Sequence, residues 1–180
     1  MELRPATAQD STAIASLHAD SWRRNYRGAY SDSFLDGDVE ADRRSVWTGR
    51  LADPSADQRT IVAEIGAGIV GFVHLICDED PEWGALVDNL HVIHECKGQG
   101  IGTVLMAAAA RALLDAHPES PRIYLWVLEQ NTAAQTFYEA RGGTRGGRGI
   151  VNPPGGGPTS VKFRYVWPDA AALIAPKHTP

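Results

Sequence analysis

The sequence has few cysteines, no long hydrophobic run and a shortage of positive charge. Its two cysteines, Cys77 and Cys96, cannot build the disulfide framework of a small secreted domain, so a reducing, cytoplasmic setting is expected. No stretch approaches the roughly 18 consecutive apolar residues of a membrane span, and residues 1 to 21 lack the apolar run of a signal peptide. The net charge of −5 argues against nucleic-acid binding through bulk charge. We therefore expect no membrane partner and no nucleic-acid partner.

Length and composition favour one globular domain. The 180 residues are 43% hydrophobic and 22% charged, which is close to the norm for proteins that bury a full core. The expected domain covers residues 1–168, and residues 169–180 are expected as a C-terminal tail because they follow the last apolar segment.

Two common phosphate motifs are missing or misplaced. No Walker pattern occurs, and the literal GxGxxG at residues 66–71 leads into another strand-like run instead of a helix. We interpret that segment as the turn of a hairpin, with a dinucleotide site as the weaker alternative.

A different glycine-rich segment, residues 97–102, has the right surroundings for an anion. An apolar strand is expected at residues 85–93 before it, and a helix rich in Ala, Leu and Val at residues 103–117 after it. Glycines allow close backbone approach, and the first amides of a helix have no internal acceptor. The segment therefore predicts binding of a phosphorylated ligand.

The remaining chain alternates between strands and helices. Strands are expected at 2–5, 60–65, 69–76, 123–128 and 161–167, and helices after a capping box at Thr7, over 39–51, and from an N-cap at Asn131 through Arg141 to a stop at Gly142. We expect an aromatic loop at 26–37, a solvated acidic turn at 78–82, and a long glycine- and proline-rich loop at 145–160, either mobile or shaped by a ligand.

Two blocks carry a resemblance to the GNAT acyltransferase superfamily. Lys97, Gly100 and Gly102 stand where that family has Arg/Gln-x-x-Gly-x-Gly/Ala, and residues 125–139 resemble its strand-Asn-helix-Phe-Tyr segment. Lys97 replaces the usual Arg or Gln but keeps the charge. The resemblance covers about residues 2–167 and implies an α+β (α/β) fold, a twisted mixed sheet of six to seven strands flanked by about four helices.

The resemblance implies acetyl-CoA as co-substrate, with no metal. Strands 85–93 and 123–128 would run parallel and splay apart, so that the pantetheine arm pairs with exposed backbone and an amide polarises the thioester carbonyl. The implied binding residues are Leu90, His91, Val92, Lys97, Gly98, Gln99, Gly100, Ile101, Gly102, Thr103 and Asn131. For Lys97 a solvated loop position is the alternative, and for Asn131 simple helix capping, which is compatible with CoA binding.

Tyr138 and Asp88 are the candidate catalytic residues. Tyr138 follows Asn131 by seven residues, as the family's general acid does, although it is also suited to the core beside Phe137. Some members of the family have a glutamate that acts as general base at the position of Leu86 or of Trp126, and neither residue is acidic in this chain. Asp88 shares strand parity with Leu86 and Leu90, so it is a candidate base, with a surface carboxylate as the alternative.

Other candidates surround these residues. His74 and His91 are alternative bases, although strand histidines are commonly structural. A metal site at His91, His94 and Cys96 is not expected, because residues 91 and 94 of a strand face opposite sides. Trp22, Tyr26, Tyr30 and Trp126 are candidates for an acceptor pocket with loop 145–160 as its lid, or for core packing. The acidic turn at 78–82 would attract a cationic amine or simply be solvated.

The sequence thus predicts an N-acetyltransferase that moves an acetyl group directly to a primary amine of a small molecule or peptide. A non-catalytic CoA-binding sensor module is the main alternative. The acceptor is not encoded in a recognisable motif, and a homodimer, common among relatives, is one open assembly state.

Overall fold

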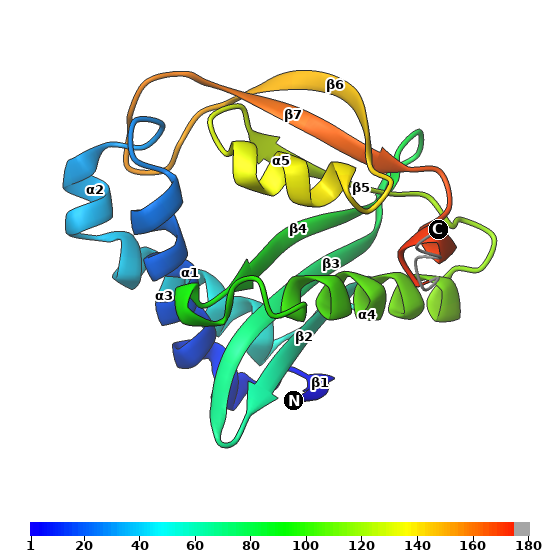
Figure 1. Ribbon diagram of the computed structural model, residues 1–180. Helices are drawn as coiled ribbons and strands as arrows, with labels where there is room; N and C mark the ends of the chain where they lie inside the picture. The colour runs from blue at the N-terminus through cyan, green and yellow to red at the C-terminus, as the bar shows by residue number, and fades with distance from the viewer. Residues whose placement is uncertain (175–180) are drawn as a thin grey trace.

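The computed structural model describes residues 1–174 and contains one sheet of seven strands with five α-helices around it (Figure 1). The strands are β1 (Glu2–Pro5), β2 (Gln58–Ile65), β3 (Gly68–Asp80), β4 (Gly84–Val92), β5 (Ile123–Leu128), β6 (Thr144–Val151) and β7 (Ser160–Trp167). The helices are α1 (Ser11–Asn25), α2 (Asp32–Asp36), α3 (Val39–Ala52), α4 (Ile101–Ala116) and α5 (Thr132–Glu139), with short 3-10 turns η1 (Ala8–Asp10), η2 (His94–Cys96) and η3 (Ala170–Leu173).

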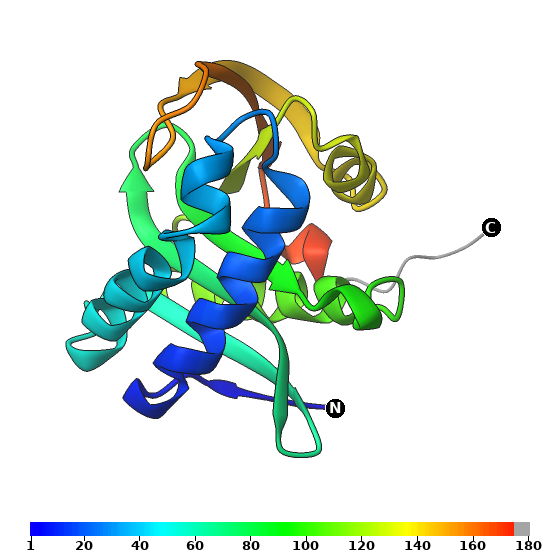
Figure 2. The same ribbon diagram turned by 90° about the vertical axis from the view of Figure 1, so that its left-hand side faces the viewer.

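The strand order is β1-β2-β3-β4-β5-β7-β6, and every pairing is antiparallel except β4 with β5. Helices α1 and α3 cover one face of the sheet and α4 and α5 the other (Figure 2). The expected mixed sheet is confirmed, and α2 is the additional helix. It forms within the segment expected as an aromatic loop, because Ser31 caps it by accepting from the amide of Phe34.

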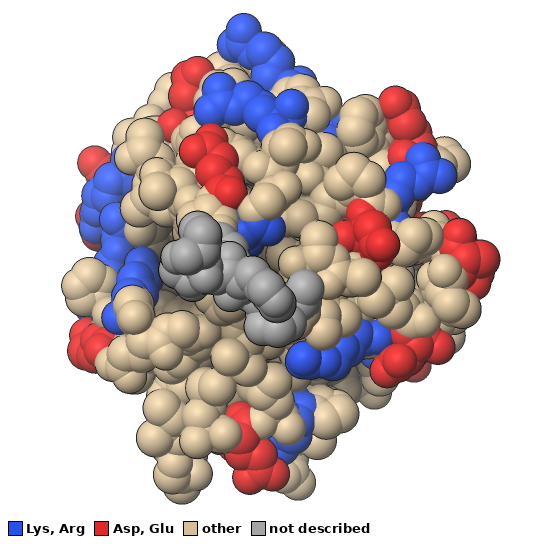
Figure 3. All heavy atoms as spheres, turned by 45° about the vertical axis from the view of Figure 1, so that its right-hand side comes forward, with Lys and Arg blue, Asp and Glu red and all other residues tan. Residues whose placement is uncertain are grey.

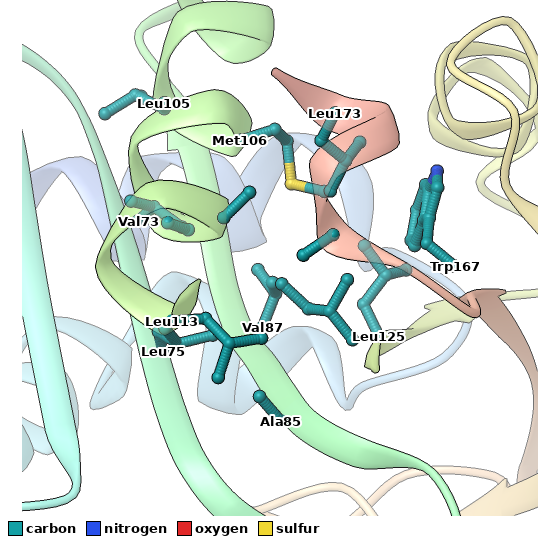
Figure 4. Close-up of a cluster of buried hydrophobic side chains, with 14 of the residues drawn as sticks. Val73, Leu75, Ala85, Val87, Leu105, Met106, Leu113, Leu125, Trp167 and Leu173 are labelled. Atoms are coloured by element: carbon teal, nitrogen blue, oxygen red, sulfur yellow. The ribbon is translucent and has the colours of Figure 1, made fainter. Parts of the chain in front are cut away.

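The largest core cluster lies between the sheet and α4 (Figure 4). Val73, Leu75 and Val87 from the sheet pack against Leu105 and Leu113 of α4, and all five are buried. The apolar composition of α4 therefore fixes this helix to the sheet and holds its N-terminus over the end of β4.

The expected loop at 145–160 is wrong for its first half, because residues 144–151 form the edge strand β6. Two of its glycines, Gly146 and Gly149, are packing positions. A Cβ at Gly149 would lie 3.2 Å from the Trp126 ring, and one at Gly146 would lie 2.8 Å from Val166. Small residues are required where bulky neighbours reach the backbone, so glycine density here does not indicate a loop.

Two other boundaries differ from the expected ones. The acidic segment 78–82 is partly strand, because β3 continues to Asp80 and pairs there with Gly84. At the other end, Ala170 and Leu173 are buried against α4, so the first part of the expected tail belongs to the core. The rest of that segment, residues 175–180, lies outside the described residues.

The surface has no large patch of one charge on the face in Figure 3, where acidic and basic groups alternate over mostly uncharged surface. Within residues 1–174 no helix is long and apolar enough to cross a membrane.

Candidate active site

The site is an opening in the middle of the sheet. Strands β4 and β5 pair only through Ala85–Val87 and Ile123–Leu125, and their later residues are not joined by ladder hydrogen bonds. A cavity of about 790 Å³ occupies this opening and extends from the N-terminus of α4 to α1. The splaying that the resemblance implied is therefore confirmed. The backbone of the last residues of β4 faces a space where a neighbouring strand would otherwise lie.

A β-bulge at Asp88 marks the start of the opening. His74 of β3 pairs with Asn89 and Leu75 pairs with Val87, so Asp88 has no partner in the register. Val87 and Leu90 consequently both pack on the α4 side. The expected common face of Asp88 and Leu90 is therefore wrong, because the extra residue reverses the alternation of side chains along the strand.

The glycine-rich turn before α4 presents free amides to the cavity. Gly98 and Gly100 have positive φ angles of 78° and 82°, which glycine adopts without strain. Among residues 1–174, the amides of residues 98–102 find no hydrogen-bond acceptor, whereas Thr103 and Val104 donate to the carbonyl of Gly100. Five consecutive unpaired N–H groups at the N-terminus of a 16-residue helix suit a phosphate group.

Arg141 adds a positive charge next to this turn and was not identified from the sequence. Its Nε donates to Oγ1 of Thr103 at 2.9 Å, and its guanidinium lies 3.6 Å from the centroid of the Phe137 ring. The pKa of Arg141 is lowered by burial. It forms no ion pair within the described chain, so its charge remains available to an anionic ligand at the cavity. Its position on the turn after α5 gives no local sequence signal.

Tyr138 lies at the cavity wall with its ring in the core. It is 8% exposed and packs against Tyr165 and Trp167. Within residues 1–174 its hydroxyl has no hydrogen-bond partner, and burial raises its pKa well above the ordinary value. The phenol therefore stays protonated at any physiological pH and has its proton free to donate. Both sequence interpretations of Tyr138, core aromatic and cavity residue, describe the same side chain.

Asp88 faces the α3 side of the cavity and is already engaged. Its Oδ2 accepts from Nη1 of Arg50 at 2.8 Å and from the amide group of Asn89 at 2.5 Å. About 30% of its side chain is exposed. A carboxylate at the bulge, open to the cavity and held in one orientation, is suitably placed to take a proton from a bound amine.

The strand histidines lie in a buried aromatic group on the α1 side. Nδ1 of His91 is 2.8 Å from Oγ of Ser21, and the His91 ring is 4.5 Å from that of His18. Burial is the main reason that the pKa of His91 falls to about 3 and that of His74 to about 4. Both are neutral at pH 7. No group of three or more His, Cys, Asp or Glu suited to a metal occurs in the described part of the chain.

Aromatic side chains form the wall at the α1 end. Trp22 stacks on Tyr26 at 5.4 Å and meets Tyr30 edge-on at 4.9 Å. Burial raises the pKa of Tyr30 to about 12, so its phenol is neutral. Trp126 lies on β5 across the cavity from this group. All four residues line the cavity, and Trp22, Tyr26 and Tyr30 also pack against one another, so for these three both sequence interpretations apply.

Of the seventeen residues expected in the catalytic, cofactor and acceptor sites, sixteen line the cavity and Gln99 does not; the alternative base His74 does not line it either. The side chain of Gln99 instead donates to the carbonyl of Glu95. The polar residues that sequence reasoning did not place there are Ser21, Asn25, Arg43, Arg50, Asn89, Tyr124, Arg141 and Lys162. Most of them come from α1, α3 and β7, whose contribution depends on how the helices and the far strand fold over the opening.

Comparison with known proteins gives a family match and several similar chains. The model of the Acetyltransferase (GNAT) family matches residues 15–143. Uncharacterized N-acetyltransferase YuaI of Bacillus subtilis is 28% identical over 177 residues and is covered, like this chain, to 95%. Probable N-acetyltransferase Rv2775 of Mycobacterium tuberculosis is 26% identical over 144 residues, 78% of each chain.

Solved structures share the fold at low identity. PaiA N-acetyltransferase from Thermoplasma acidophilum, in complex with coenzyme A, superposes with a TM-score of 0.69 at 17% identity over 92% of this chain and 98% of that one. YncA, a putative acetyltransferase from Salmonella typhimurium with its cofactor acetyl-CoA, gives 0.68 at 14% identity over 100% and 97%.

Proposed function

Because this chain belongs to the GNAT acetyltransferase family and is an N-acetyltransferase, we propose that it transfers acetyl from acetyl-CoA directly to a primary amine while both are bound. The observation that carries this proposal is the continuous cavity that is lined at one end by Gly98 and residues 100–102, whose amides have no acceptor among residues 1–174, and farther along by Tyr138. A ligand with a diphosphate at one end and a reactive thioester at the other fits such a site. The cavity wall continues past Tyr138 to Trp22, Tyr26 and Tyr30, where an acceptor would lie.

The diphosphate end would lie on the turn before α4. The amides of residues 98–102 supply hydrogen bonds, while Lys97 and Arg141 supply positive charge on either side of the helix N-terminus. Asn131 already caps α5 by accepting from the amide of Ala134 at 3.2 Å, and its free N–H groups are available to the pantetheine arm. Leu90, His91 and Val92 would offer backbone groups to the same arm.

The acetyl end would lie at the bulge of β4. Backbone N–H groups of β4 that are not paired with β5 would polarise the thioester carbonyl as the amine attacks it. As the C–N bond forms, Asp88 takes the proton that the amine loses, directly or through water. As the C–S bond breaks, Tyr138 donates its proton to the leaving thiolate and regains one from solvent.

Release of free thiol from acetyl-CoA, measured with a panel of amines, tests this proposal. We expect Tyr138→Phe to lower kcat by about 10²- to 10⁴-fold, the usual contribution of a general acid, and to leave the Kd for CoA within about twofold. The hydroxyl has no partner in residues 1–174, so its removal should not change the stability of the protein.

Tyr165→Phe is the matched control. Tyr165 packs against Tyr138 but does not line the cavity, and its hydroxyl bonds to Oε1 of Glu139 at 2.5 Å. This variant should lose about 1 kcal/mol of stability and keep its kcat. Wild-type kcat in Tyr138→Phe would contradict the acid role, and CoA binding without turnover of any amine would favour a non-catalytic binding module.

A further inference from the structure

Two cations that form no ion pair within residues 1–174 lie at the acceptor end of the cavity, Lys162 in the cavity wall and Arg164 directly beside it. Lys162 and Arg164 of β7 both lie over the ring of Trp126, at 4.4 and 4.6 Å from its centroid. The three side chains share one face because Arg164 is opposite Trp126 in the β5–β7 register. Neither cation forms an ion pair with any residue in the part of the chain that the structure describes.

These cations are in an unfavourable environment without a ligand. Lys162 lines the cavity and is partly buried; burial lowers its pKa, the nearby Arg164 lowers it further, and Asp88 opposes the shift. The Nε atom of Arg164 is buried and has no hydrogen-bond partner among residues 1–174. An anionic group on a ligand beside Lys162 would stabilise both cations, since Arg164 also lies over the Trp126 ring although it does not itself line the cavity.

The two arginines at this end are already paired. Arg43 bonds to Asp42 and lies over Trp22, and Arg50 bonds to Asp88. Glu79 is the remaining lining carboxylate without an ion pair in the described residues. The acceptor end of the cavity therefore presents carboxylates at Asp88 and Glu79 and, at Lys162, a cation that has no ion-pair partner among residues 1–174. That arrangement complements a ligand that carries both an amine and an acid.

A further contact joins the loop after β6 to the segment before α2. The loop between β6 and β7 contacts the residues before α2: the amide of Ser31 donates to the carbonyl of Gly156 at 3.0 Å, and its Oγ donates to that of Gly155 at 2.8 Å. A Cβ at Gly155 would overlap the ring of Phe34. The contact lies next to the cavity, because Tyr30 and Val151 on either side of it belong to the cavity wall.

We propose that the acceptor is a small amine bearing a carboxylate, such as a free amino acid, with its carboxylate on Lys162 and its amine beside Asp88. Arg164 strengthens the positive potential behind Trp126. This assignment rests on the proposed acetyl transfer and narrows its substrate class.

Matched acceptors test the assignment. Each L-amino acid in a panel is assayed beside its C-terminal amide, which keeps the amine and side chain and removes the negative charge. We expect at least one acid to exceed its amide in kcat/KM by about tenfold or more, as loss of a charged hydrogen bond implies. Lys162→Met should abolish this preference by raising KM for the acid, with kcat and the Kd for CoA retained. Lys162→Arg should preserve the preference.

Arg148→Met is the control variant. Arg148 is an exposed cation on β6, opposite Phe163 in the register and outside the cavity. Its removal should therefore leave kcat/KM unchanged for both the acid and the amide. Amides or polyamines that outperform every acid would overturn the assignment while leaving acetyl transfer intact, and so would an equal effect of Lys162→Met on acid and amide.

Calorimetry on the CoA-loaded protein separates the two proposals. An acid that binds at least tenfold more tightly than its amide supports the assignment even without turnover, whereas equal binding refutes it.

Discussion

Replacing Gly100 by alanine tests whether the turn before α4 is the anion anchor. Gly100 has φ of 82°, and nothing lies within 4 Å of the position where a Cβ would stand. The methyl group therefore meets no clash, and the whole penalty is the left-handed backbone conformation, which costs a non-glycine residue about 1–2 kcal/mol. The preorganised amides of the turn depend on this conformation, so a turn that escapes the strain by changing φ no longer presents them to the ligand. With ligand it must return, so the strain reappears as lost affinity.

We expect Gly100→Ala to raise the Kd for CoA by about 5- to 30-fold, the equivalent of about 1–2 kcal/mol. Isothermal titration calorimetry with CoA measures this shift. Gly142→Ala is the matched control, because Gly142 has the same φ of 82° and equally open surroundings but does not line the cavity.

The Gly142→Ala variant shows whether a loss of CoA affinity comes from the turn before α4 or from backbone strain in general. Gly142→Ala should carry the same strain, about 1–2 kcal/mol in the free energy of unfolding or a few degrees in Tm, with its CoA affinity unchanged. If Gly100→Ala bound CoA as tightly as Gly142→Ala, amides preorganised by the left-handed turn would not be the anchor. The diphosphate would then have to rely on side chains such as Lys97 and Arg141.

Two further predictions concern charge. Asp88→Asn should lower kcat by about 10²-fold or more with CoA affinity retained, because an amide cannot accept the amine's proton; a loss below about fivefold would assign that proton to water. Burial holds the pKa of His74 at about 4 and that of His91 at about 3, so the unfolded state, with histidine near 6.5, binds more protons between these values. The free energy of unfolding in urea should therefore fall by up to about 2 kcal/mol per histidine between pH 6.5 and pH 5, and an unchanged value would refute their burial as neutral groups.

The sequence was sufficient for features that depend on local chemistry. The hairpin turn at residues 66–68, the N-cap Asn131 and the left-handed stop at Gly142 are all confirmed, because each depends on one residue and its immediate neighbours. The glycine-rich turn was recognised for the same reason. Its glycines, the preceding strand and the following helix are contiguous in the chain.

Features created by distant contacts were not predictable in this way. The glycines of β6 resemble loop residues until the rings of Trp83 and Trp126 are placed against Gly146 and Gly149. Lys162 and Arg164 give no signal of their own, because they reach the cavity only through the register of β7 against β5. Arg141 similarly becomes a site residue only when α5 packs beside the start of α4.

The bulge at Asp88 shows why strand parity failed at the centre of the site. A strand that leaves its partner to create an opening would ordinarily present its core residues to that opening. The extra residue lets Val87 before it and Leu90 after it both pack toward α4, so β4 keeps its core face while its backbone faces the cavity. The same shift turns His91 toward His18 and leaves Asp88 beside Arg50. A regular strand would place Asn89 and His91 on the same face as Ala85 and Val87, whereas the bulge places Leu90 and Val92 there. The signal in the sequence is therefore the apolar spacing 85, 87, 90 and 92, which strict alternation does not detect.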